Sequence, residues 1–208
     1  MKNTFEKSKK IFLEALKCLV NEDFNSAERK LLESYRLTPN RISIISNLIQ
    51  IYIKLEDSTK LKNFLKKNDN FNDTFDYKVG LGFLEYFEKN HEESLNICKD
   101  LKPQNLKQKV QTINLKIKNL DELNKFDDVI SLYDEILLIE KDNYINFYNF
   151  GTFLYKTGDP KKALKYLYKA FDLKNDFPGL KWNISLCELK LGNFKKGFSY
   201  YNYRWKNK

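Results

Sequence analysis

The sequence predicts an all-α protein made of repeated helix pairs, and three observations support this fold class. Glycine and proline number only 7 and 4 among 208 residues, which disfavours loop-rich and collagen-like chains and favours long helices. Apolar residues recur at helical spacing, as at Ala163, Leu167 and Ala170, whereas alternating strand patterns are scarce. Turn signals also return at a nearly constant interval, which is typical of stacked structural repeats.

The turns that precede the second helix of each pair set the register of the repeat. They lie at Asp23-Phe24, Asp57-Ser58, Asn90-His91, Lys125-Phe126, Asp159-Pro160 and Asn193-Phe194. Successive turns are 34, 33, 35, 34 and 34 residues apart. We therefore expect one helical-repeat domain over residues 1–208, with units near 8–41, 42–74, 75–109, 110–143, 144–177 and 178–208.

Each unit should have one residue of its first helix and one of its second where the two helices cross. Small side chains are favoured at such a point because they let the two backbones approach. In the first helices this residue is Ala15, Ile49, Gly82, Ile117, Gly151 and Ser185. In the second helices it is Ala27, Leu61, Ser94, Val129, Ala163 and Gly197.

Two departures predict less regular stacking in the middle of the array. Pro103 should end the second helix of the third unit early, because it has no N–H to donate and disfavours helix in the residue before it. The stretch KKNDNFNDTF at positions 66–75 is typical of a loop that shortens the second unit.

The fifth unit, residues 144–177, resembles the tetratricopeptide repeat. Its first helix matches that family at Phe147, Phe150, Gly151 and Leu154, and its second at Ala163, Leu167 and Ala170. The resemblance implies a right-handed superhelical solenoid of about six antiparallel helix pairs. The segment at residues 192–205 is similar to the closing part of bacterial tetratricopeptide arrays that precede a glycosyltransferase-like domain.

The resemblance also implies a concave wall formed mainly by the first helices, which binds proteins. Here that wall is rich in amides and aromatic rings, which suits an extended polypeptide, because an amide both donates and accepts hydrogen bonds. The candidate peptide-binding residues are Asn47, Phe83, Tyr86, Asn114, Tyr148, Asn149, Tyr155, Trp182 and Asn183.

Asn47, Asn149 and Asn183 share one register position, which forms an asparagine ladder in the arrays of O-linked N-acetylglucosamine transferases. The alternative is a coincidence of composition, since asparagine is abundant throughout. Chaperone-binding members carry a basic clamp for a terminal carboxylate at positions that hold Asp76 and Gly80 here. We therefore expect no such clamp.

The second helix of the last unit offers another candidate interface, Phe198, Tyr201 and Trp205. Their counterparts in the fifth unit should be buried by the next helix pair, whereas the chain ends at Lys208. An uncovered apolar stripe marks an interaction site. We expect it to dock on a second copy or on a partner enzyme such as a separately encoded glycosyltransferase, unless Tyr200 and Tyr203 shield it.

The net charge of +9 raises nucleic acid or an anionic membrane as partners, but composition argues against both. Only four of 37 basic residues are arginine, the residue preferred for bidentate phosphate contacts. A nucleic-acid-binding repeat remains an alternative, with basic residues Lys161, Lys162, Lys165, Lys169, Lys195 and Lys196. No apolar run is long enough for a membrane span, so we expect a cytoplasmic protein.

Catalytic, metal and cofactor sites are not expected. The single histidine, His91, is expected at a solvated turn, and Glu85 and Glu188 are too far apart in sequence to share a substrate. Cys98 and Cys187, like the third cysteine, Cys18, make no disulfide framework, which favours a reducing compartment. Neither a glycine-rich phosphate loop nor a metal-spaced cluster occurs.

Overall fold

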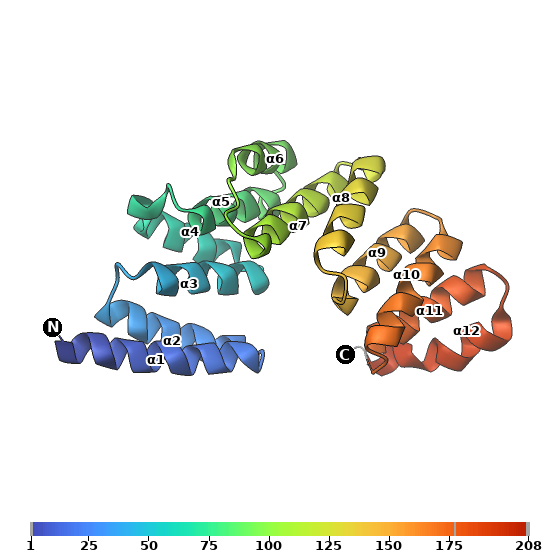
Figure 1. Ribbon diagram of the computed structural model, residues 1–208, viewed down its shortest axis with the longest axis horizontal. Helices are drawn as coiled ribbons and strands as arrows, with labels where there is room; N and C mark the ends of the chain where they lie inside the picture. The colour runs from blue at the N-terminus through green and yellow to red at the C-terminus, as the bar shows by residue number, and fades with distance from the viewer. Residues whose placement is uncertain (1, 177, 207–208) are drawn as a thin grey trace. The chain divides into compact units, whose positions relative to one another are not determined.

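The computed structural model describes residues 2–176 and 178–206, and over these residues it contains helices and turns but no strand (Figure 1). The chain divides into two compact units, each larger than one helix-pair repeat. The first unit is Met1–Asn119 and the second unit is Leu120–Lys208, and the boundary between them falls within one helix, α7. The predicted all-α helical-repeat fold is confirmed.

Short turns and loops join the described helices. The odd-numbered helices are α1 (Lys2–Val20), α3 (Ile42–Lys54), α5 (Phe75–Phe87), α7 (Leu106–Glu122), α9 (Tyr144–Lys156) and α11 (Pro178–Lys190). The even-numbered helices are α2 (Phe24–Leu37), α4 (Ser58–Lys67), α6 (His91–Asp100), α8 (Phe126–Ile139), α10 (Pro160–Leu173) and α12 (Phe194–Tyr201). Two 3₁₀ helices, η1 (Asp69–Phe71) and η2 (Asn202–Lys206), complete the described elements.

Every odd-numbered helix ends in the same left-handed turn. The residues with positive φ are Glu22, Glu56, Lys89, Asn124, Gly158 and Gly192. They follow one another at 34, 33, 35, 34 and 34 residues, the intervals expected from the sequence. In the first turn the N–H of Asp23 donates to the carbonyl of Cys18 at 2.9 Å, and the same five-residue bond recurs in the other turns. This Schellman geometry satisfies carbonyl groups that the end of a helix leaves unpaired.

The crossing residues predicted from the register are all buried. In two helix pairs, α5–α6 and α11–α12, a serine hydroxyl of one helix donates a hydrogen bond to the backbone of the other helix at the crossing. Ser94 Oγ of α6 donates to the carbonyl of Gly82 in α5 at 2.7 Å. Ser185 Oγ of α11 donates to the carbonyl of Gly197 in α12 at 2.9 Å. In the first of these pairs glycine is in the odd-numbered helix and serine in the even-numbered one, and in the second pair the positions are reversed. The close approach and the hydrogen bond are present in both pairs.

The irregular middle follows the predicted breakers. Helix α6 ends at Asp100, three residues before Pro103, and Leu101 has an extended backbone with φ −68° and ψ 131°. Helix α4 ends at Lys67 and is followed by η1 and a turn. The predicted loop over 66–75 is therefore shorter than expected, because its first two residues close α4 and its last, Phe75, opens α5.

The two cores differ in chemistry. In the first unit, branched aliphatic residues are fully buried; they include Leu31, Ile44, Leu48, Leu61 and Leu65. In the second unit the centre is aromatic, since the ring of Phe150 lies 4.7 Å from that of Tyr133 and 4.4 Å from that of Tyr166. Each core holds its odd-numbered helices in place and so fixes the positions of the side chains that these helices carry.

Candidate functional site

The first unit contains a polar cleft to which three successive odd-numbered helices contribute. Its volume is about 230 Å³. Its lining residues are Ser46, Asn47 and Gln50 of α3, Asp76 of α5, Asn105 just before α7, and Lys107, Gln108 and Gln111 of α7. We call this the amide cleft, because amide side chains form most of its lining. Asn47 was the one lining residue among the predicted site residues.

Two groups in the amide cleft have unused bonding capacity. The Nε2 of Gln50 is buried without a hydrogen-bond partner in the described part of the chain. The carboxylate of Asp76 is half-buried and accepts one hydrogen bond, 2.7 Å long, from Ser46 Oγ. Among the described residues no lysine or arginine forms an ion pair with Asp76. A buried donor and an unpaired carboxylate both gain from a polar ligand.

The other predicted residues of the first unit differ in accessibility. Asn114 of α7 is half-buried. Tyr86 is also half-buried; its ring lies 5.6 Å from that of His91, and the Lys118 ammonium lies 5.4 Å from its centre. Phe83 is only 9% exposed and belongs to the core, so it does not form part of an accessible surface. The reason is that α3, α4 and α6 all pack against α5.

In the second unit the predicted amides lie on α9 and α11. Asn183 Nδ2 donates to Thr152 Oγ1 at 2.8 Å, and Thr152 Oγ1 in turn donates to the carbonyl of Tyr148. Asn149 is exposed. Asn183 thus uses one of its N–H donors in the contact between α9 and α11, and its side-chain oxygen is left to accept from a ligand. The Asn149 amide faces solvent. Asn47 uses its own Nδ2 within α3, where it donates to the carbonyl of Ser43 at 2.7 Å.

Aromatic side chains connect the predicted wall of the second unit with the predicted C-terminal edge. Tyr155 is half-buried, and the Lys190 ammonium lies 5.3 Å from its ring centre. Trp182 of α11 contacts Tyr201 of α12 edge-to-face at 5.2 Å. The two surfaces were predicted separately, but they share this aromatic contact.

The C-terminal edge exposes large apolar side chains. Phe198 is 60% exposed and Trp205 62%, while Tyr201 is half-buried. The Arg204 guanidinium lies 4.4 Å from the ring of Trp205 and 4.6 Å from that of Tyr201, and it donates to the Tyr201 hydroxyl at 2.9 Å. Phe194 extends this surface, stacked 6.5 Å from Phe198. We call these residues the aromatic edge.

No family model and no curated protein matches the chain. Solved structures do match. The crystal structure of PilW, a widely conserved type IV pilus biogenesis factor, has a TM-score of 0.76 at 14% identity and covers 96% of this chain and 93% of that one. Pseudomonas aeruginosa PilF has a TM-score of 0.67 at 11% identity, with 95% and 90% covered.

The APC/C hetero-tetramer Cut9–Hcn1 also matches, with a TM-score of 0.72 at 12% identity over 93% of this chain. The chain spans 37% of the length of that matched chain. These structures are tetratricopeptide-repeat proteins. The fold is tetratricopeptide-like. At such low identities the likeness establishes the fold alone.

Glu85 and Glu188 have a structural explanation in this tetratricopeptide-like fold. At the start of α12, Asn193 Nδ2 donates to Glu188 Oε2 at 2.7 Å, and at the start of α6, Asn90 Nδ2 donates to Glu85 Oε2 at 2.8 Å. Each glutamate thus binds the residue that opens the next helix. Their shared register reflects this turn contact.

The two buried thiols lie in environments that disfavour the thiolate. Burial raises the pKa of Cys98 to about 11 and the pKa of Cys187 to about 12. His91 is half-buried rather than solvated as predicted, because its ring packs against Tyr86 and its Nδ1 lies 3.2 Å from the side-chain Oδ1 of Asn119. Within residues 2–176 and 178–206, no three potential metal ligands lie together, and no helix is long and apolar enough to cross a membrane.

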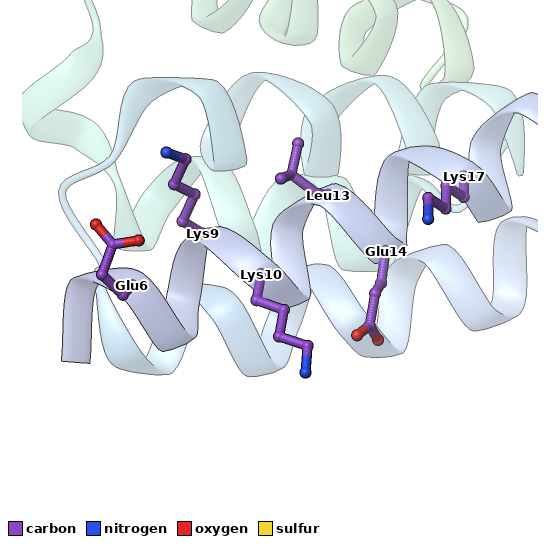
Figure 2. Close-up of a pocket in the computed structure, with 6 residues that line it drawn as sticks. All are labelled: Glu6, Lys9, Lys10, Leu13, Glu14 and Lys17. Atoms are coloured by element: carbon purple, nitrogen blue, oxygen red, sulfur yellow. The ribbon is translucent and has the colours of Figure 1, made fainter. Parts of the chain in front are cut away.

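A shallow hollow of about 320 Å³ lies on α1 at the start of the tetratricopeptide-like array (Figure 2). It is lined by one helix only, through Glu6, Lys9, Lys10, Leu13, Glu14 and Lys17. Figure 2 shows Lys9 and Leu13 pointing to one side of the helix and Lys10 and Glu14 to the other. Glu14 is engaged by Lys30 at 2.6 Å. These side chains do not converge on a common ligand position.

Sequence reasoning missed the side of the amide cleft that α7 and the residue before it provide. Asn105, Gln108 and Gln111 were not singled out, and Asp76 was considered only as the residue that replaces a basic clamp. One signal was available, since Gln108 and Gln111 are three residues apart, a spacing that places them on one side of a helix, and Asn105 precedes them at the same spacing.

Proposed function

We propose that the chain is a non-catalytic scaffold that binds an extended polypeptide on its odd-numbered helices. The observation that supports this best is the buried, unpartnered Nε2 of Gln50 in a cleft lined by α3, α5 and α7. A polypeptide backbone offers a carbonyl acceptor and an N–H donor at every residue, and primary amides can bind both. In the second unit, Tyr155 and Trp182 would add aromatic contact area to Asn149 and Asn183.

The titratable groups favour binding over catalysis. The thiols of Cys98 and Cys187 have raised pKa values, so they are poor nucleophiles at neutral pH. Glu188 is engaged by Asn193 and by Tyr168, whose hydroxyl donates to Glu188 Oε1 at 2.8 Å. The free thiols suit a reducing compartment, in agreement with the cytoplasmic location that we propose.

The aromatic edge is the second binding surface in this proposal. Phe198 and Trp205 would dock on a second copy of the chain or on a partner enzyme. The resemblance of residues 192–205 to bacterial arrays that precede glycosyltransferase domains makes a separately encoded glycosyltransferase the first enzyme to test. The exposed fractions of these two side chains support an edge that can bind without unfolding.

Nucleic acid is a weaker candidate, favoured by exposed lysines on α10. Lys165 and Lys169 are exposed and lie 5.8 Å from the ring centre of Tyr166. Binding through such a surface would depend steeply on salt, because each neutralised phosphate releases counterions.

Capture from nuclease-treated extract of the source cells, followed by mass spectrometry, tests the proposal. Wild type should retain a polypeptide that the Asn149→Ala/Asn183→Ala variant loses. The matched control, Asn25→Ala/Asn175→Ala, removes two exposed amides elsewhere and should retain it. A polypeptide lost only with Trp205→Ala would assign binding to the aromatic edge. Retention by every variant, or capture that requires nucleic acid, would contradict the scaffold proposal.

A further inference from the structure

The lining of the amide cleft includes one carboxylate, that of Asp76. Asp76 lies in the first turn of α5, where its carboxylate is half-buried. Ser46 Oγ satisfies Oδ2 at 2.7 Å, and no described base forms an ion pair with the carboxylate. A carboxylate partly removed from water and left without a cation binds a positively charged donor favourably.

The neighbouring amides can fix the backbone that brings such a donor into the cleft. Asn105 Oδ1 accepts from the N–H of Gln108 at 2.9 Å, and Gln108 Oε1 accepts from the N–H of Gln104 at 2.7 Å. Both carbonyl oxygens are therefore used at the start of α7, and their NH₂ groups remain as donors. Together with Nε2 of Gln50, they match the carbonyl oxygens of an extended chain.

The size of the cleft limits what can enter it. Its volume of about 230 Å³ is smaller than pockets that enclose a drug-sized ligand, which start at roughly 300 Å³. It has room for one long side chain and the adjoining backbone. Lys107 also lines it, but this side chain is exposed and loses little by staying solvated.

From these contacts we propose that the amide cleft selects a lysine or arginine side chain of the bound polypeptide. The cationic head would bond the free oxygen of Asp76, and the adjoining carbonyl would accept from Gln50 Nε2. This inference rests on the proposed function, since it names one specificity position within the polypeptide-binding surface. Lys107 would remain free to bond a carbonyl or an acidic residue of the same segment.

The test uses fluorescein-labelled nonapeptide pools whose central residue is fixed as lysine, norleucine or glutamate, with degenerate flanks. Fluorescence anisotropy with the full chain at physiological salt should show the lysine pool binding about tenfold more tightly than the norleucine pool. Asp76→Asn should remove this preference. Asp73→Asn should not, because Asp73 is an exposed acid that does not line the amide cleft and changes the net charge equally.

Charge reversal is the second variant. Asp76→Lys should move the preference to the glutamate pool, a gain that general loss of folding cannot produce; a melting curve of each variant accompanies the titration. Equal binding of the lysine and norleucine pools to wild type, or a lysine preference that survives Asp76→Asn, would overturn this inference and leave the scaffold proposal standing. If wild type binds no pool at all, both proposals fail.

Discussion

A Cβ atom placed on Gly151 would lie 2.7 Å from Cγ of Leu167 and 3.1 Å from the carbonyl oxygen of Ala163. The backbone of α9 therefore approaches α10 with no room for a side chain. Gly82 is constrained differently, since its Cβ would meet Leu115 of α7 at 2.7 Å. The crossing glycines thus serve packing within a pair in one case and packing between neighbouring pairs in the other.

Gly151→Ala should destabilise the protein by about 1–3 kcal/mol, the usual cost of overpacking a core. The opposite sign would follow from helix propensity alone, which favours alanine over glycine by about 1 kcal/mol. Urea unfolding of the full chain separates the two. Leu167→Ala on the Gly151→Ala background should cost less than the sum of the single changes. A Gly151→Ala variant as stable as wild type would show that this close contact does not limit packing.

Glu56→Gly should stabilise the protein by about 1 kcal/mol, because Glu56 has φ 53°, a left-handed conformation that costs an L-residue about that much. Gly158→Ala should do the reverse. Gly158 has φ 98°, and an added Cβ would meet nothing within 4 Å, so only backbone strain would act. Thermal unfolding of both variants checks the pair. If both variants melted at the wild-type temperature, the left-handed turn would not be a determinant of stability.

Glu188→Gln should destabilise the protein near neutral pH and matter less in acid. Burial raises the pKa of Glu188, but hydrogen bonds from Tyr168 and Asn193 and the nearby Lys196 outweigh it, so the pKa is lowered overall. A lowered folded-state pKa stabilises the fold above the unfolded pKa, and this contribution is lost as pH falls through the folded value.

The expected loss for Glu188→Gln is about 1–3 kcal/mol at about pH 7, since the hydrogen bonds that Tyr168 and Asn193 donate would no longer go to a charged group. Lys196 adds little to this figure because its side chain is 56% exposed and can return to water. Urea unfolding at about pH 7 and about pH 4 should show the difference from wild type shrinking in acid. A pH-independent difference would mean that the ionised carboxylate is not what stabilises the α11–α12 pair.

Phe198→Ala/Trp205→Ala should leave the melting temperature nearly unchanged, because exposed substitutions usually alter stability by less than about 0.5 kcal/mol. The same change should abolish any self-association or partner capture that uses the aromatic edge, measured by sedimentation velocity and by pull-down. Leu138→Ala on α8, which is 72% exposed, is the matched control and should change neither. A large drop in stability would instead make the aromatic edge part of the folding core.

The helical-repeat fold could be predicted because its information is local and recurrent. The left-handed conformation of Glu22, Glu56 and Lys89 was not predicted, because their residue types do not indicate it, but each lies directly before a turn that the repeat spacing predicted. Phe83 was assigned to the surface because register gives only the direction of a side chain, whereas three neighbouring helices decide its exposure. The amide cleft joins Ser46 with Asp76 and α7, and such a meeting depends on how whole helices pack.

Photo-crosslinking from the odd-numbered helices tests the central claim most directly. p-Benzoylphenylalanine would replace Asn149 on α9 or Gln111 on α7, and Leu138 on the even-numbered helix α8 as the control, in full-length protein irradiated in nuclease-treated extract. The account predicts crosslinks to a polypeptide from positions 149 and 111 but not from 138. Crosslinks from 138 alone, or equal crosslinking from all three positions, would contradict a polypeptide-binding surface on the odd-numbered helices.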